Sequence, residues 1–331
     1  MEHRISIPGR FIPGGSPGIR EGRMSGTIAE EAIVGGETEL EARPLTGGAL
    51  VVAILLSALW GTNPTALKVV LRGFPPIGSA GVRFAIAALG VALWCRATRV
   101  RLWPLPGEEV ALGVNALFFI LQIATFTLGV HWGTAGHSIV LLHTYPLFVV
   151  ALAHFLIPGD RTTPGKLAGL AMAFGGIVAL FAGDWGRWQG TQLQGDVVQV
   201  VSAWLLAGQI VWIKHAVARV DSSRLVFWQM ATSAAVFIVY SLAAEGLAGT
   251  RGGAWPVAAV LYQGLIIGTL CFTVWTWLIR RHAASRVAIF GFVGPLVGVG
   301  LSAVVLGEGV TPQLLLASAL VAGGIVFASR W

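Results

Sequence analysis

Long apolar stretches separated by short polar segments dominate the chain from residue 48 onward. Ten of them reach about twenty residues, the length of α-helix that crosses a hydrocarbon core ~30 Å thick. They run over residues 48–71, 77–96, 108–130, 134–157, 164–183, 196–218, 223–245, 255–279, 284–306 and 311–329. Because the stretches are continuously apolar and do not alternate over about ten residues, they predict helices and exclude a membrane β-barrel. We therefore expect an all-α integral membrane protein with ten transmembrane helices.

The composition agrees with a chain whose main solvent is lipid. Hydrophobic residues fill 55% of the 331 positions and charged residues only 11%, against about 25% charge in an average soluble domain. Residues 1–47 differ, with seven acidic residues and five arginines among repeated Gly and Pro, and no apolar core of the signal-peptide type. We expect this segment to be a disordered cytoplasmic tail.

The basic residues predict the orientation of the helices. With a cytoplasmic N-terminus, seventeen Lys and Arg fall in cytoplasmic segments, and four fall in outer segments, namely Lys68, Arg72, Arg187 and Arg251. Positive charge concentrates on the cytoplasmic side of membrane proteins, so we expect both termini in the cytoplasm. Arg83 lies inside a span, and the sequence alone assigns it no role. Topology thus explains the net charge of +7, and we expect no nucleic-acid partner.

The chain repeats a series of proline, acidic, Thr-Pro and Gly-Gly positions after 148 or 149 residues. The two series are Pro146, Asp160, Thr163-Pro164 and Gly175-Gly176, and Pro295, Glu308, Thr311-Pro312 and Gly323-Gly324. Residues 48–183 and 196–331 are then two five-span units, and an odd number of spans makes the second unit enter the membrane inverted. Inverted repeats are typical of secondary transporters, whose substrate site lies near the midplane between the repeats.

Three predicted spans carry a proline deep inside, and two of these prolines are repeat mates. Proline has no N–H, so it frees the carbonyl one turn earlier and kinks the helix. Kinked helices in symmetric positions can open a polar cavity, although a kink that only suits helix packing is an alternative. The candidate hinge residues are Pro64, Pro146, Gly294 and Pro295.

Mid-span polar and aromatic residues are the candidates for lining such a cavity. Amides in hydrocarbon are costly unless they pair or face a wet space, so Gln122 and Gln209 should point inward, to bind a solute or to join helices. Trp275 and Trp277 lie about 200° apart around a helix, so both cannot face one cavity, and we favour Trp275. The candidate set is Trp60, Asn63, Phe118, Gln122, His137, His143, Tyr145, Gln209, Trp212 and Trp275.

The acidic residues outside the tail all flank the apolar stretches, and none lies in the middle of one. Many ion-coupled carriers place an Asp or Glu at the coupling site, whereas here only His137 and His143 could titrate in mid-span near neutral pH. We therefore expect facilitated diffusion, or weak coupling through histidine. Cys95 and Cys271 lack metal-ligand spacing, and we expect no metal and no cofactor.

The mid-span prolines and the series at the end of the chain resemble the drug/metabolite transporter superfamily, in its EamA-type branch. The resemblance covers residues 48–331 and includes Val305-Leu306-Gly307-Glu308, where the first half reads Pro158-Gly159-Asp160 instead. The stretch from His143 to Phe148 and the Trp-rich second half are similar to aromatic amino-acid exporters of this branch. The resemblance implies export of aromatic and other neutral amino acids across the bacterial plasma membrane, with a central cavity between the halves.

Several alternatives differ from this interpretation in substrate or in class. A carrier of drugs, quaternary ammonium compounds or other metabolites would share the same fold, and a passive channel would lack saturable exchange. An intramembrane enzyme is disfavoured because H-E-x-x-H, G-x-S-x-G and a membrane Asp pair are absent from the sequence. The expected partners are a small-molecule substrate and the lipid bilayer, and the arrangement is compatible with a monomer.

Overall fold

The computed structural model describes residues 47–156, 163–183, 190–217, 219–246, 250–281 and 293–328, and within these ranges the chain is helical with no strand. The predicted tail up to residue 46 and the repeat position Asp160 lie outside the described residues. The helices are α2 (Gly47–Val70), α3 (Pro76–Ala97), α4 (Glu109–Trp132), α5 (Ala135–Leu142), α6 (Tyr145–Leu156), α7 (Pro164–Gly183), α8 (Thr191–Ala216), α9 (Ser222–Tyr240), η1 (Ser241–Glu245), α10 (Ala254–Tyr262), η2 (Gln263–Cys271), α11 (Phe272–Arg281), α13 (Val293–Leu306) and α14 (Pro312–Ala328).

Each described helix overlaps one of the predicted apolar spans. Six helical segments of the described chain are long and apolar enough to cross a membrane: Gly47–Val70, Pro76–Ala97, Glu109–Trp132, Thr191–Ile213, Ser222–Glu245 and Ala254–Leu278. Residues 164–180 of α7, α13 and residues 312–327 of α14 are apolar but shorter. Two of the long segments are partly π-helical. The segment Ser222–Glu245 ends in η1, and η2 forms the middle of the segment Ala254–Leu278.

The predicted fourth span is two helices and not one kinked helix. α5 ends at Leu142 and α6 begins at Tyr145, with His143 and Thr144 between them. Pro146 has no N–H to donate to the carbonyl of Leu142, four residues earlier, and its ring crowds that turn. Within the break, the Thr144 hydroxyl donates to the carbonyl of Leu141, three residues earlier, at 2.6 Å. Pro64, in contrast, lies inside α2, which continues past it.

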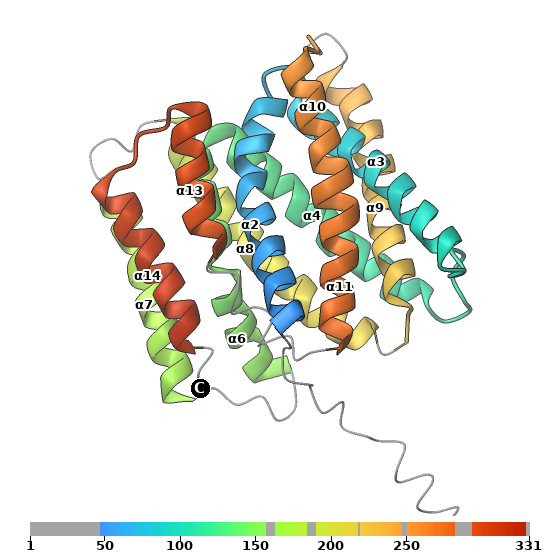
Figure 1. The fold of residues 1–331 in the computed structure, drawn as a ribbon, viewed down its shortest axis with the longest axis horizontal. Coiled ribbons are helices and arrows are strands. Elements are labelled where there is room, and N and C mark those ends of the chain that lie inside the picture. The colour runs from blue at the N-terminus through green and yellow to red at the C-terminus, as the bar shows by residue number, and fades with distance from the viewer. Residues whose placement is uncertain are drawn as a thin grey trace, which may run out of the picture. The chain divides into compact units, whose positions relative to one another are not determined.

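Helices distant in sequence pack in pairs. α7 lies along α14 at one edge of the bundle, and α3 lies along α9 toward the other edge, as Figure 1 shows. Between them, α4 packs on α8, and α2 packs on both α13 and α10. Each of these pairs joins a helix from the first half of the sequence, up to α7, to one from the second half, which begins with α8.

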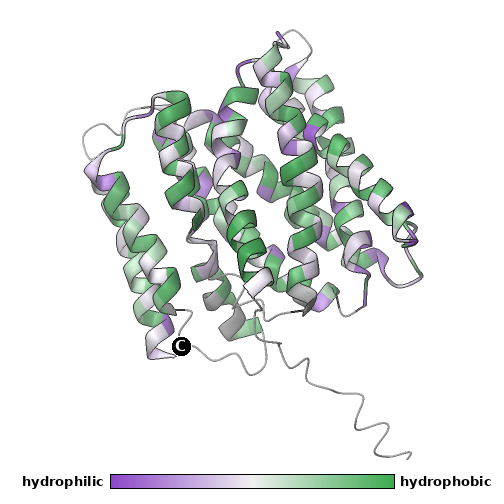
Figure 2. Cartoon of the chain, in the orientation of Figure 1, coloured by the Kyte–Doolittle hydropathy of each residue, from purple (hydrophilic) through white to green (hydrophobic). Residues whose placement is uncertain are grey.

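The outer surfaces of the helices are apolar. Phe155, Trp255 and Val304 are each more than 80% exposed, and hydrophobic residues line the helices over most of their length (Figure 2). A water-soluble protein would bury such side chains, whereas lipid solvates them as well as a protein core does.

α2 and α13 cross at closely packed glycines in the middle of the bundle. A Cβ added at Gly298 would lie 2.7 Å from the carbonyl oxygen of Gly61, and one added at Gly61 would lie 3.0 Å from the Cα of Gly294. Gly294 and Gly298 are four residues apart on α13, the spacing at which small residues let two membrane helices approach closely. This crossing holds α2 against α13 beside the break between α5 and α6.

Candidate functional site

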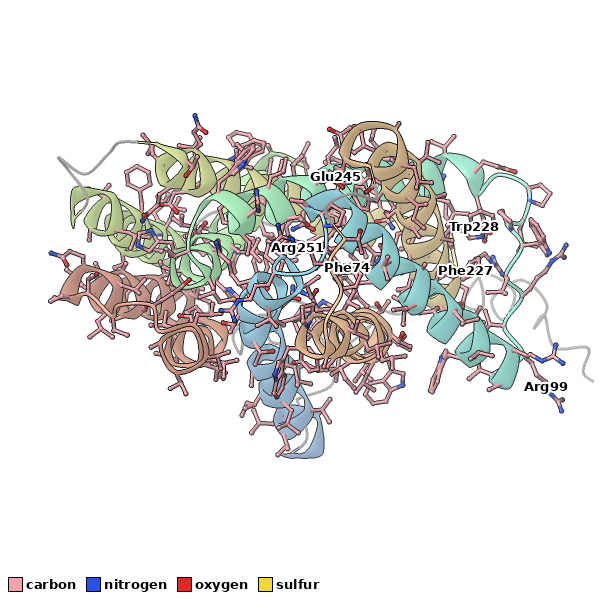
Figure 3. The ribbon with its side chains drawn as sticks, turned by 90° about the horizontal axis from the view of Figure 1, so that it is seen from above. Phe74, Arg99, Phe227, Trp228, Glu245 and Arg251 are labelled. Atoms are coloured by element: carbon pink, nitrogen blue, oxygen red, sulfur yellow. The ribbon has the colours of Figure 1, made fainter. Side chains whose placement is uncertain are left out.

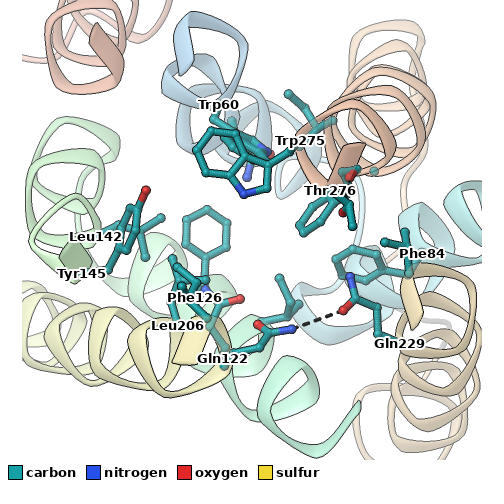
Figure 4. A pocket seen from close by; sticks show the side chains of 18 of the residues that line it. Trp60, Phe84, Gln122, Phe126, Leu142, Tyr145, Leu206, Gln229, Trp275 and Thr276 are labelled. Carbon is teal, nitrogen blue, oxygen red and sulfur yellow. Dashed lines mark hydrogen bonds between the residues drawn. The ribbon is translucent and has the colours of Figure 1, made fainter. Parts of the chain in front are cut away.

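A cavity of about 1430 Å³, open mouth included, lies at the middle of the bundle. Trp60 in α2 and Gln122 in α4 line it, and each is the fourteenth residue of a 24-residue helix. Figure 4 shows side chains from several helices converging on this space. The described lining residues are Ser57, Trp60, Asn63, Arg83, Phe84, Gln122, Ile123, Phe126, Leu142, His143, Tyr145, Leu206, Gln209, Ile210, Ile213, Leu225, Val226, Gln229, Gln263, Ile267, Gly268, Phe272, Trp275 and Thr276.

One wall of the cavity is aromatic. The rings of Trp60 and Trp275 meet edge to face with centroids 4.8 Å apart, and Phe272 stands 5.7 Å from Trp60. Phe119 continues the series behind the wall, at 5.7 Å from Phe272 and 5.0 Å from Phe84. Edge-to-face contact is a preferred geometry of aromatic pairs, so the cavity presents an apolar wall of rings that pack on one another.

The facing wall carries hydrogen-bonded amides. Gln229 Oε1 accepts from Asn115 Nδ2 at 2.8 Å and from Gln209 Nε2 at 3.3 Å, and Gln209 Nε2 also lies 3.3 Å from Asn115 Oδ1. Gln122 Nε2 donates to Ser202 Oγ at 3.0 Å. Gln122, Gln209 and Gln229 line the cavity while Asn115 lies behind them, so these amides both join α4, α8 and α9 and border the open space.

A second amide pair fastens η2 to α2. Gln263 Nε2 donates to Asn63 Oδ1 at 2.7 Å and lies 3.3 Å from the Asn63 carbonyl oxygen, and the hydroxyls of Thr62 and Tyr262 meet at 2.6 Å. Gln263 begins the π-helical segment η2, which also contributes Ile267 and Gly268 to the lining. Short π-helical turns inside α-helices are frequent at functional sites.

The break between α5 and α6 supplies the third side of the cavity. His143 lies in this break and Tyr145 is the first residue of α6; their ring centroids are 6.2 Å apart, and both line the cavity. His143 Nδ1 lies 2.8 Å from the carbonyl oxygen of Ile139. A carbonyl only accepts, so Nδ1 carries the proton of this bond. Nε2 then faces Gly294 of α13, where a Cβ would overlap the imidazole ring.

The bundle is closed by hydrogen bonds at the end where α2 and α4 finish and α5 and α8 begin, here called the α5 end. His137 Nδ1 and Asp196 Oδ2 are 2.9 Å apart, which links α5 to α8. The carboxylate of Glu308, which follows α13, accepts from the backbone N–H groups of Ala135 and Gly136, both at 2.9 Å. Glu245, labelled in Figure 3, accepts in the same way from Ile77 and Gly78 at the start of α3.

The cavity extends toward the opposite end, where α8 and α11 finish and α9 begins, here called the α9 end. α8 contributes only residues from Leu206 onward to the lining, and α9 contributes Leu225 and Val226, the fourth and fifth of its residues. Beside the mouth, Arg224 is paired with Glu108 and donates to the carbonyl of Arg101 at 2.9 Å. Trp228 (Figure 3) donates to the carbonyl of Leu102 at 2.8 Å.

Seven of the ten predicted lining residues come together in this cavity: Trp60, Asn63, Gln122, His143, Tyr145, Gln209 and Trp275. The other three lie elsewhere. The Phe118 ring packs against Gly208 of α8, His137 joins Asp196 at the α5 end, and Trp212 donates to the carbonyl of Ala111 at 3.1 Å. Trp277, which we disfavoured, is 44% exposed.

The candidate hinges surround the same space. Pro64 is buried within α2, one turn from Trp60, and Pro146 follows the break between α5 and α6. Gly294 and Pro295 lie in the first described turn of α13, with Gly294 against His143. Residues 282–292, which precede α13, lie outside the described residues.

Sequence reasoning missed five polar lining residues, namely Arg83, the amides Gln229 and Gln263, and the hydroxyls Ser57 and Thr276. The two glutamines lie in predicted spans and carry the same signal that selected Gln122 and Gln209, a costly amide in an apolar stretch. Arg83 stood out as a charge inside a span. Its meaning depends on which groups surround it, and these come from other helices.

Apolar helices around an internal cavity with an amide wall and an aromatic wall are the architecture of a multi-pass membrane transporter. The EamA-like transporter family model matches residues 47–182 and again residues 193–330, and the chain belongs to this family. Family membership makes the chain a membrane transporter rather than an enzyme.

Relatives align over most of their own length. A protein of Escherichia coli (strain K12) named as a probable amino-acid metabolite efflux pump is 26% identical over 293 residues, which cover 85% of this chain and 95% of that protein. The uncharacterized transporter YoaV of Bacillus subtilis (strain 168) is 24% identical over 276 residues, covering 82% and 93%. One solved crystal structure shares the fold with a TM-score of 0.60 at 22% identity, covering 85% of this chain and 96% of that one.

Proposed function

We propose that this protein exports small metabolites, in particular aromatic and other neutral amino acids, across the bacterial plasma membrane by alternating access through the central cavity. The observation that carries the proposal is the cavity itself, at mid-depth of the bundle and lined by aromatic rings and amides. Amides suit the polar backbone of an amino acid, and aromatic rings suit a flat apolar side chain. The name of the Escherichia coli relative, an amino-acid metabolite efflux pump, agrees with this substrate class.

Three observations support ten spans arranged as inverted five-helix halves, residues 48–183 and 196–331. The helix packing is symmetric: α4 on α8 corresponds to the α10–η2 helix on α2, and α2 on α13 corresponds to α8 on α6. Two pairs of lining residues are also 149 positions apart, Trp60 with Gln209 and Phe126 with Trp275. The family model likewise matches the chain twice.

Alternating access requires that the cavity open to one side while the other is closed. The α5 end is held by the His137–Asp196 pair and by Glu308 on the first turn of α5, and the lining extends toward the α9 end. The distribution of Lys and Arg supports a cytoplasmic position for the α9 end and for both termini. The described conformation is then inward-facing, and opening the α5 end would release the substrate outward.

The charges of the cavity support transport with little or no ion coupling. The described lining residues include no Asp or Glu, the groups that many carriers use to couple ion movement to transport. His143 is the one histidine among the described lining residues. Substrate would then move down its own gradient.

Counterflow into proteoliposomes tests the proposal. Purified protein in liposomes preloaded with unlabelled amino acid should take up radiolabelled phenylalanine, tryptophan or tyrosine, with saturation and at several times the rate of empty liposomes. The same assay with a quaternary ammonium compound or a nucleotide sugar tests the other substrate classes. Counterflow of one of these compounds, with no amino acid moving faster than in empty liposomes, would contradict the amino-acid assignment.

A further inference from the structure

Arg83 is a buried cation on the lining of the cavity without an anionic partner. It is the eighth residue of α3 and only 2% exposed. Its Nη2 lies 3.4 Å from Thr127 Oγ1, and its Nε has no hydrogen-bond partner. Among the described residues, no carboxylate lies within ion-pair distance of it. A guanidinium stays charged in a protein, so a full positive charge borders the cavity with one long neutral hydrogen bond.

Arg224 shows how the same chain satisfies an arginine whose role is structural. It is 6% exposed, yet its guanidinium pairs with both carboxylate oxygens of Glu108 and donates to the carbonyl of Arg101. Arg83 has instead the rings of Phe84 and Phe126, with centroids 4.7 and 5.8 Å from its Cζ. Ring contacts offset only part of the cost of removing a charge from water. Charged groups within a membrane protein pair with a partner or mark a substrate pathway.

We propose that Arg83 binds the carboxylate of the transported substrate. Arginine presents two parallel N–H donors that match the two oxygens of a carboxylate. Arg83 is the one Lys or Arg among the described lining residues, which include no Asp or Glu. The cavity therefore suits a substrate with a single carboxylate, and a zwitterion would leave its ammonium group for neutral acceptors. This inference rests on the proposed function and specifies how the substrate is recognised.

The same cavity offers an acceptor for the ammonium group. Gln263 is 1% exposed, and its Nε2 is held by Asn63 while its Oε1 has no hydrogen-bond partner. Gln263 and Arg83 lie on adjoining turns of η2 and α3. A Cβ at Gly264, the residue after Gln263, would lie 3.0 Å from the carbonyl oxygen of Arg83. An α-amino acid with its carboxylate on Arg83 and its ammonium on Gln263 Oε1 would direct its side chain toward the aromatic wall.

Ligand-induced thermal stabilisation of the purified protein tests the inference without requiring transport. The probes are L-phenylalanine, 3-phenylpropionate, which keeps the carboxylate and lacks the amine, and L-phenylalaninamide, which lacks the carboxylate. We expect phenylalanine to bind the unmodified protein at least tenfold more tightly than its amide, and 3-phenylpropionate to bind more tightly than the amide as well. Arg83→Gln should lose that preference, and Arg83→Lys should keep part of it.

Arg96→Gln is the matched control, because it removes the same charge from an exposed position on the same helix and should bind like the unmodified protein. Equal binding of phenylalanine and its amide to the unmodified protein would overturn the proposal, and this comparison does not depend on a variant that folds. A folded Arg83→Gln protein that retains the preference would overturn it too.

The outcomes separate this inference from the proposed function. Counterflow of amino acids together with unchanged binding by Arg83→Gln would refute the role of Arg83 and leave amino-acid export standing. Arg83-dependent binding of 3-phenylpropionate, with no counterflow of any amino acid, would support the carboxylate site and refute amino-acid export.

Discussion

The rings of Trp60 and Trp275 meet edge to face with their centroids 4.8 Å apart, although the two residues belong to α2 and α11, far apart in the sequence. This contact joins the first predicted span to the eighth at the mid-depth cavity. A substrate ring that stacks against this wall gains a contact that an aliphatic side chain cannot make.

Replacement of Trp275 should weaken transport of aromatic substrates. Aromatic pairs contribute about 0.5–1.5 kcal/mol beyond the burial of area, so Trp275→Ala should raise the half-saturation concentration for tryptophan by roughly threefold to tenfold in counterflow. Trp275→Phe should keep most of the affinity. Trp277→Ala is the control, because Trp277 lies two residues further along α11 and is 44% exposed. Equal effects of the two alanine variants would count against an aromatic substrate wall.

The amides around Gln229 should contribute to stability as well as to the cavity. Gln229→Met removes the acceptor for Asn115 and Gln209, and Asn115 is fully buried. We expect the loss to lower the free energy of unfolding by about 1–2 kcal/mol, measured as thermal unfolding in detergent.

Gln199→Met is the comparison for Gln229→Met. Gln199 is also fully buried, but neither atom of its amide has a hydrogen-bond partner. Removing an unsatisfied buried amide should leave stability unchanged or raise it. A Gln199 variant that is destabilised as much as the Gln229 variant would show that the hydrogen bonds of Gln229 are not the cause.

Much of the fold follows from the sequence, because in lipid the length of an apolar run is itself the structural signal. The boundaries of α2, α3 and α7 lie within one residue of the predicted spans, whereas α8 begins five residues earlier than predicted. The complete interruption at His143 and Thr144 and the π-helical segment η2 could not be predicted. A proline predicts a disturbed helix, but neighbouring helices decide whether it bends or ends.

A lining residue could be predicted where the sequence of its own helix indicates which way its side chain faces. The amide of Gln122 would be costly to expose to lipid, and Trp275 lies on the opposite side of its helix from Trp277. Both Gln122 and Trp275 line the cavity. His137 could not be separated from His143 in this way. The acidic partner of His137 comes from α8, and no spacing within one span indicates that Asp196 lies 2.9 Å away.

The hydrogen bonds at the α5 end should control which side of the cavity is open. Asp196→Asn weakens the contact with His137, and we expect it to favour the conformation open at the α5 end. The measurement is the rate at which a membrane-impermeant maleimide labels Leu206→Cys, a partly exposed lining position, with Cys95 and Cys271 replaced by alanine.

In the parent protein, Leu206→Cys should react mainly from the cytoplasmic face, in inverted vesicles. Asp196→Asn should raise labelling from the outer face, in right-side-out vesicles, by severalfold. Thr98→Ala, which alters an exposed hydroxyl at the opposite end of α3, should change neither rate. No shift in the Asp196 variant would mean that this pair does not hold the α5 end closed.

A proton gradient should add little to transport. Because no described lining residue is Asp or Glu, proteoliposomes with an imposed pH gradient should accumulate phenylalanine no more than about twofold above equilibrium. Any residual effect should disappear in His143→Gln. Strong uphill accumulation that persists without His143 would refute uncoupled transport.

The most direct test of the account asks whether substrate passes through the central cavity. Leu206→Cys protein should carry out counterflow of phenylalanine before labelling and lose it once the thiol reacts with a bulky maleimide. Phenylalanine should slow the labelling at concentrations near its half-saturation value, whereas phenylalaninamide at the same concentration should not. Full counterflow by completely labelled protein, with no protection by any amino acid, would contradict transport through this cavity.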